Sequence, residues 1–153
     1  MVRAYKAERP TKVPVISLTE DLYRHLSEHS HRKFYSQDID PLKSFRRYDD
    51  EKVSFWYLDY LSICAESIGP RFSSAQRQAY STATPDEKQR IVNEGYEANL
   101  TALFTDHATA IKEAYGRAES DSVKNKYTWL ASYHKEIASY FTTSQTCACE
   151  LKS

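Results

Sequence analysis

This chain of 153 residues contains only three glycines, at Gly69, Gly95 and Gly116. Glycine supplies the positive φ angles that hairpin turns and phosphate-binding loops require. The chain therefore holds neither a GxGxxG dinucleotide fingerprint nor a GxxxxGK[ST] phosphate-binding loop. A fold with many tight turns between strands is disfavoured for the same reason, and a helical protein is expected.

Long apolar runs and net charge are also lacking. No segment approaches the roughly 20 apolar residues of a membrane span, and the N-terminus lacks the apolar stretch of a secretory signal. The 21 basic and 21 acidic residues balance, so no net field attracts the protein to nucleic acid or to an anionic membrane. We therefore expect an intracellular, cytoplasmic protein with no membrane partner.

What the chain does contain is enough apolar material for a core. Hydrophobic residues make up 41% of the chain and aromatic residues 13%, and twelve of the aromatics are tyrosines. A chain of this length and composition is most simply one domain with a core built largely of amphipathic rings.

Helix signals are strongest in the C-terminal half. The segment Thr84–Glu87 combines an N-cap, a first-turn proline and a capping box. An apolar stripe with steps of three and four follows it, and a second stripe has heptad spacing. These stripes predict helices over about 85–116 and 121–143, which a short turn joins into an antiparallel hairpin.

Weaker signals predict further helices in the N-terminal half. They are a helix over about 18–35 with a Ser17/Glu20 capping box, a short one capped by Asp40, one over 49–68, and a minor one capped by Ser73.

The expected fold class is all-α: a single bundle of five or six helices built around the hairpin. Residues 1–16 are expected to form an extended basic arm, residues 17–143 the helical bundle domain, and residues 144–153 a polar tail.

Two histidines, His107 and His134, lie near the centres of the two hairpin stripes. Helical bundles hold metals and haem through inward ligands of this kind. With a turn centred near residue 118, however, the two rings are offset by about four residues, or roughly 6 Å along the axis. We therefore expect hydrogen-bonded core histidines and no cofactor, while a metal or haem protein using His107 and His134 is a second alternative.

Motifs of enzymes are absent from the sequence, which has no GxSxG, HExxH, paired CxxC or EF-hand pattern. The sequence thus favours a protein that is not an enzyme. Basic residues adjoin aromatic rings in two clusters, and such pairs can bind phosphate and stack on bases. A nucleic-acid-binding accessory protein is therefore an alternative function, with a site made of Arg32, Lys33, Arg46 and Arg47.

Surplus aromatic residues suggest a protein partner. On the last helix a second row of rings runs beside the core stripe, and the predicted 49–68 helix carries an unusually wide apolar arc. Tyrosine and tryptophan commonly anchor interfaces. We predict a non-catalytic helical protein–protein interaction module, such as a subunit, adaptor or inhibitor, that binds another protein or itself. Its predicted partner-binding residues are Trp129, Tyr133, Tyr140, Trp56 and Phe55.

Overall fold

The computed structural model describes residues 17–18, 20–29, 41–49, 54–141, 149 and 151. The expected N-terminal arm and most of the expected polar tail lie outside these residues. The elements in chain order are β1 (Ser17–Leu18), α2 (Glu20–His29), the 3-10 turn η1 (Pro41–Ser44), β2 (Phe45–Asp49), β3 (Ser54–Leu58), α3 (Tyr60–Ser67), α4 (Ser74–Thr82), α5 (Pro85–Gly116) and α6 (Asp121–Phe141).

The predicted all-α fold is wrong. The described residues are mostly helical, but they include a three-stranded antiparallel sheet with the strand order β1-β3-β2. The helix expected over 49–68 exists only as α3, because its first half is the strand β3. Residues Pro41–Ser44 form a single 3-10 turn that leads into β2, and Ser17 pairs with Tyr57 in the sheet instead of capping a helix.

The composition of β3 explains why it is a strand. Its sequence, Ser-Phe-Trp-Tyr-Leu, is dense in aromatic residues, which favour the pleated surface of a sheet. Burial alternates along it: Phe55 and Tyr57 are buried, whereas Trp56 and Leu58 are only partly buried. This period of two belongs to a strand. In the helix expected over 49–68, Phe55 falls in the polar stripe. This misplaced aromatic residue was the sign in the sequence that the segment is not a helix.

The chain divides into two compact units, Met1–Ile63 and Cys64–Ser153. In the first unit, Trp56 joins α2 to the sheet. Its ring stacks on Tyr23 of α2 with centroids 3.6 Å apart and planes 2° apart, and its Nε1 donates a hydrogen bond of 3.1 Å to the carboxylate of Glu20. On the neighbouring strand, the guanidinium of Arg47 lies 5.8 Å from the centroid of the Trp56 ring.

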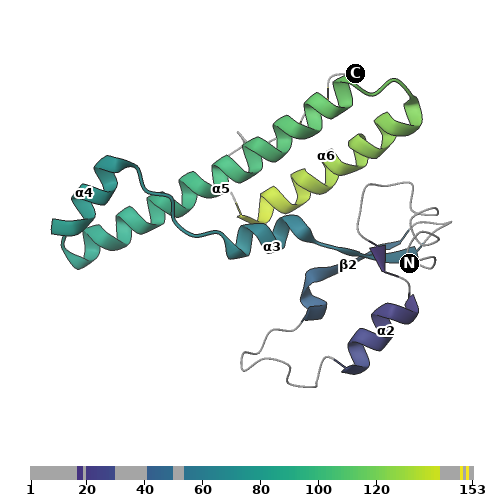
Figure 1. Ribbon diagram of the computed structural model, residues 1–153, viewed down its shortest axis with the longest axis horizontal. Helices are drawn as coiled ribbons and strands as arrows, with labels where there is room; N and C mark the ends of the chain where they lie inside the picture. The colour runs from purple at the N-terminus through teal and green to yellow at the C-terminus, as the bar shows by residue number, and fades with distance from the viewer. Residues whose placement is uncertain are drawn as a thin grey trace. The chain divides into compact units, whose positions relative to one another are not determined.

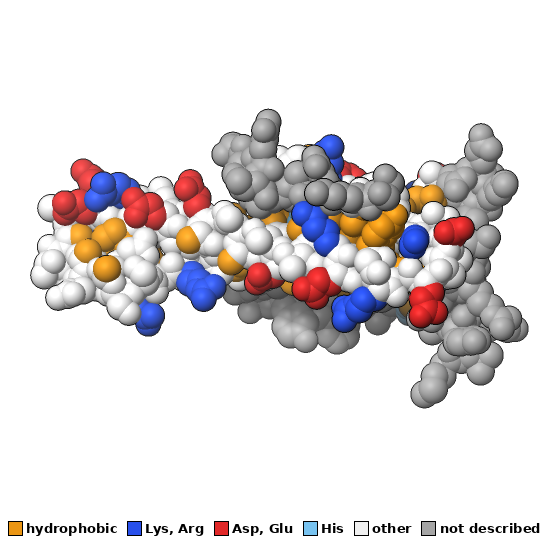
Figure 2. Space-filling view, turned by 90° about the horizontal axis from the view of Figure 1, so that it is seen from above, with side chains coloured by type: hydrophobic (Ala, Val, Ile, Leu, Met, Phe, Trp, Pro, Cys, Tyr) orange, Lys and Arg blue, Asp and Glu red, His pale blue; other side chains and the backbone are white. Residues whose placement is uncertain are grey.

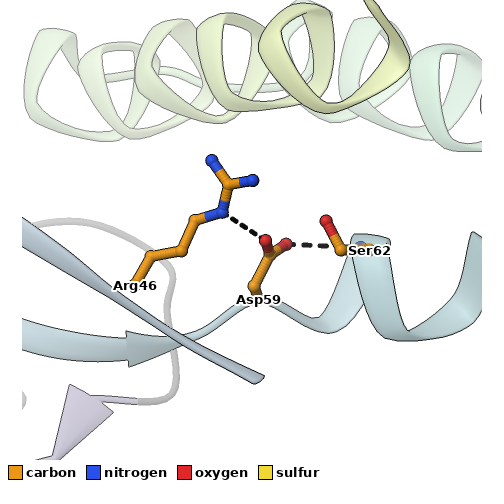
Figure 3. Close-up of polar contacts among 3 residues, drawn as sticks. All are labelled: Arg46, Asp59 and Ser62. Atoms are coloured by element: carbon orange, nitrogen blue, oxygen red, sulfur yellow. Dashed lines mark hydrogen bonds and ion pairs between the residues drawn. The ribbon is translucent and has the colours of Figure 1, made fainter. Parts of the chain in front are cut away.

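Asp59 connects the sheet to α3 (Figure 3). Its carboxylate accepts a hydrogen bond of 3.2 Å from the backbone N–H of Ser62, which is the N-cap contact of α3. The same carboxylate forms an ion pair with Nε of Arg46 on β2, and the Asp59 N–H donates to the carbonyl of Ser44 at 2.7 Å. One buried side chain therefore holds β2 and the start of α3 together.

The second unit is organised around the long helix α5. Figure 1 shows α4 beside the first half of α5 and α6 beside its second half. The predicted capping boxes at Ser73 and Thr84 are confirmed, and α5 ends at Gly116 as expected. None of the described helices is long and apolar enough to cross a membrane. The hairpin core includes Phe104, Ala108, Ile111, Ala131, Ile137 and Ala138.

The segment 69–72, which precedes α4, passes close to α5 at Gly95. A Cβ atom at this position would lie 3.1 Å from Phe72 and from Pro70, and 3.2 Å from the carbonyl oxygen of Arg71. The Arg71 N–H donates to the Gly95 carbonyl at 2.9 Å, and the Asn99 amide donates to the carbonyl of Gly69 at 2.7 Å. This crossing fixes the segment that leads into α4.

Replacing Gly95 with Val should destabilise the second unit by about 1–3 kcal/mol, because the added carbons displace the crossing segment. The Arg71 amide should then exchange its hydrogen faster than in the wild type. Gly116→Ala is the matched control, since nothing lies within 4 Å of its added Cβ. That variant should be at least as stable as the wild type, because alanine has the higher helix propensity and Gly116 is the last residue of α5. Slow exchange of the Arg71 amide in Gly95→Val would contradict the close crossing.

Candidate functional site

Helices α5 and α6 bring His107 and His134 together inside the hairpin. Their Nδ1 atoms are 2.9 Å apart, their ring centroids 5.1 Å apart and their ring planes 22° apart. With nitrogens so much closer than centroids, the rings meet edge to edge in nearly one plane. This is the geometry of an N–H···N hydrogen bond, in which one Nδ1 carries a hydrogen and the other accepts it.

The offset expected between these histidines is wrong, for a geometric reason. Every helical side chain leans toward the N-terminus of its own helix. In an antiparallel hairpin, the side chain of His107 therefore leans away from the turn, whereas that of His134 leans toward it. Each shift is worth about one residue, so about half of the expected offset disappears. The remainder corresponds to about 3 Å along the axis.

The pair does not have the spacing of a metal site. Two nitrogens bound to one tetrahedral Zn²⁺ at about 2.0–2.1 Å lie roughly 3.4 Å apart, and their lone pairs converge on the ion. Here the two nitrogens are closer than that and face each other. Among the described residues, no group of three or more His, Cys, Asp and Glu side chains is placed to hold a metal ion. The geometry therefore fits a shared proton better than a shared metal.

An aromatic ring of the hairpin core packs against the pair. His134 is 0% exposed, and the ring of Phe104 meets it edge-on at a centroid distance of 5.7 Å. Phe141 lies 6.2 Å from Phe104. Burial, followed by the proximity of His134, lowers the pKa of His107 to about 4. At neutral pH the imidazole of His107 is therefore uncharged.

The five predicted partner-binding residues do not share one exposed surface. Phe55 and Tyr133 are buried, Trp56 stacks on Tyr23, and Trp129 stacks on Tyr133 at a centroid distance of 5.6 Å with planes 5° apart. Tyr140 alone among the five is highly exposed, at 67%.

The basic residues of the predicted nucleic-acid site are partly engaged within the first unit. Arg46 pairs with Asp59, while Nε of Arg47 donates to Ser54 at 3.2 Å and lies 3.4 Å from the carboxylate of Asp49. Arg32 and Lys33 lie outside the described residues.

Sequence reasoning missed a surface formed by α4 and the first half of α5, residues 74–99, here called the α4–α5 arm. The helix α4 has no buried residue. Tyr80 is 38% exposed and Tyr96 is 40% exposed. Tyr80 contacts Phe72 at a centroid distance of 5.9 Å, and the ammonium of Lys88 lies 5.5 Å from its ring centroid. In the sequence, Tyr80 and Tyr96 were the residues that could have indicated this surface.

Cys149 lies in the segment 144–153, which the sequence predicts to be a polar tail, and its burial was not expected. Its side chain is buried against Ala108 and Ala131 of the hairpin, and its Sγ lies 3.8 Å from the carbonyl oxygen of Ala108. Burial raises the pKa of this thiol, with the charge of Lys112 opposing the shift. The thiol is therefore protonated at neutral pH, and it serves as a small apolar group.

No protein-family model, no curated protein and no solved structure matches this chain.

Proposed function

We propose that this protein is a non-catalytic interaction protein that binds another protein through its α4–α5 arm. The observation that carries the proposal is that α4 is a capped helix without a single buried residue. A nine-residue helix is marginal on its own in water and normally gains its stability by burying an apolar face. A partner protein that covers α4 would supply the missing burial.

The local contacts support a preformed surface. At the start of α4, Ser73 accepts from the Gln76 N–H at 3.2 Å, and the Gln76 side chain accepts from the Ser73 N–H at 2.9 Å. At the start of α5, the N–H and hydroxyl of Thr84 both donate to Glu87 at 2.8 Å, which lowers the pKa of that carboxyl. Capped ends and the crossing at Gly95 order the arm before a partner arrives, which reduces the entropic cost of binding.

The composition of this surface suits a protein partner. The left-hand end of Figure 2, where α4 and the start of α5 lie, shows a small group of hydrophobic side chains bordered by side chains of both charges. Aromatic anchors within a charged border are the usual anatomy of a protein–protein interface. Tyr80 and Tyr96 are the exposed rings of the arm and the proposed anchors.

The double variant Tyr80→Ser/Tyr96→Ser should lose at least tenfold in affinity, because each anchor contributes about 1–2 kcal/mol to such an interface. The measurement is recovery of bound protein on the immobilised full chain from an extract of its source cells, followed by titration of the species recovered. Self-association is measured on the same variants by light scattering over a concentration series.

Val123→Ser is the matched control. Val123 is an exposed hydrophobic residue on α6, 37% exposed and outside the arm. Both variants should melt close to the wild type, since exposed substitutions change stability little. Equal binding by wild type and the double variant would contradict the arm as the binding surface.

A further inference from the structure

The chain returns to the hairpin after α6 has ended. Cys149 is 8% exposed and packs in one cluster with Ala108 of α5 and Ala131 of α6, and Leu151 is partly buried against the same cluster. Ala131 lies ten residues before Phe141, the last residue of α6, which corresponds to about 15 Å along the helix axis. The direction of the chain therefore reverses between Phe141 and Cys149.

The place where this segment lies on the hairpin is apolar. The Sγ atom of Cys149 is 3.8 Å from the carbonyl oxygen of Ala108. Tyr127 and Leu130 of α6 are partly buried and pack against the same cluster. Cys149 and Leu151 thus cover apolar groups of both helices, and the contacts are those of small and aliphatic side chains, which burial from water stabilises.

We propose that Cys149 and Leu151, here called the C-terminal strap, form a closure that opens and closes on the hairpin while α5 and α6 stay packed together. Opening uncovers the apolar groups beneath the strap, among them Tyr127 and Leu130. This inference concerns the second half of the hairpin and does not depend on the proposed binding surface of the arm.

The hairpin has core contacts of its own that hold the helices when the strap is open. Phe104 and Ile137 are both 0% exposed, and they lie outside the cluster that contains Cys149. The ring of Phe104 contacts the rings of His134 and Phe141, so it joins α5 to α6 directly. Opening of the strap therefore breaks fewer contacts than unfolding of the hairpin, and it should occur more often.

The connection to α6 is long enough for the strap to leave without drawing on the helix. The eight residue steps from Phe141 to Cys149 can span about 26–29 Å when extended. The distance back along α6 to Ala131 is only about 15 Å. The sequence of the connection, TTSQTCA, begins with five polar residues and so offers little apolar surface to bury.

The thiol of Cys149 reports the open form. In the closed form the side chain is buried, and burial raises the pKa of the thiol, with the charge of Lys112 opposing the shift. A disulfide reagent reacts with an accessible thiolate. The Cys149 sulfur forms a new S–S bond with one sulfur of the reagent, the reagent's own S–S bond breaks, and its other half leaves as a coloured thiolate that absorbance measures.

The test measures how fast dithiobis(nitrobenzoate) modifies Cys149 in the full chain carrying Cys64→Ser/Cys147→Ser, which leaves one thiol. The folded chain should react about 10–1000-fold more slowly than the same chain unfolded in urea. Adding Leu151→Ser should raise the folded rate about tenfold, because the lost burial of a leucine shifts the opening equilibrium by about this factor.

Val123→Ser is the control, because this exposed residue of α6 lies outside the cluster, and it should keep the rate of the single-thiol parent. Circular dichroism should show that both variants melt close to that parent. A rate that Leu151→Ser does not change would overturn the proposal. So would a folded parent that reacts as fast as the unfolded chain.

Low concentrations of urea separate opening of the strap from unfolding of the hairpin. Below the unfolding transition the rate of modification should rise only slightly with urea, because opening of the strap exposes little surface. If the rate rises as steeply as the equilibrium constant for unfolding, the thiol is reached only through unfolding and a separate strap does not exist.

Discussion

Asp59→Ala should lower the free energy of unfolding of the first unit by about 3 kcal/mol. The substitution removes the N-cap of α3, a contact worth about 1 kcal/mol. It also leaves the Arg46 guanidinium without its anion, and breaking a buried ion pair from one side destabilises by about 3–5 kcal/mol. Because Arg46 is 31% exposed and can turn toward water, we expect the ion pair to contribute about 2 kcal/mol, below this range, which gives the total of about 3 kcal/mol. Denaturant unfolding followed by Trp56 fluorescence, in a Trp129→Phe background, measures it.

The asparagine variant separates the two roles of Asp59. An asparagine oxygen still caps a helix, so Asp59→Asn should lose only about 1–2 kcal/mol, most of it from the ion pair. A double-mutant cycle with Arg46→Met should show that the Asp59 and Arg46 effects are not additive. Additive effects, or a loss below about 0.5 kcal/mol in Asp59→Ala, would mean that this side chain does not join the sheet to α3.

Phe104→Ala should destabilise the second unit by about 3–5 kcal/mol. Phe104 is 0% exposed, and its ring contacts the rings of both His134 and Phe141. Truncation removes the buried ring and leaves a cavity that the packed hairpin can close only in part. The measurement is chemical denaturation followed by Trp129 fluorescence in a Trp56→Phe background.

Tyr96→Ala, two turns earlier on the same helix, is the matched comparison. Tyr96 is 40% exposed, so the loss expected for this variant is within about 0.5–1 kcal/mol. If the two substitutions had similar effects, the core of the second unit could not be centred on Phe104.

The elements from Ser74 to Phe141 could be predicted from the sequence because their signals are local. Capping boxes at Ser73 and Thr84, a proline at the first position of α5 and a stripe with helical spacing all depend on residues within a few turns of each other. A sheet depends on pairing between distant segments, such as Ser17 with Tyr57, which no local pattern contains.

The error in the segment 45–58 shows how a local signal can mislead. Asp49 and the acidic residues after it resemble the first turn of a helix, but Asp49 is the last residue of β2 and pairs with Ser54. Asp59 is the true N-cap, and Ser62 three residues later is its partner. The aromatic content of Phe55–Tyr57 favours a strand, but the periodicity of so short an apolar run does not distinguish a strand from a buried helix segment.

The candidate sites could be predicted only in part. The sequence placed His107 and His134 on the inner faces of their helices, and the structure has both in the hairpin core. The distance between the two rings could not be predicted in the same way. It depends on the direction in which each side chain leans, and counting residues along the helix axis does not include that direction. The exposed face of α4 is harder to recognise, because a helix that buries none of its side chains has no apolar stripe to detect.

The central claim, that the α4–α5 arm binds a protein, is tested most directly by site-specific photo-crosslinking. Benzoylphenylalanine is placed at Tyr96 or, as the matched exposed position on α6, at Val123 in the full chain. Irradiation in an extract of the source cells should give one discrete species from position 96, near 35 kDa if the partner is a second 17.7 kDa copy, and none from position 123. No species from position 96, or the same species from both positions, would contradict the claim.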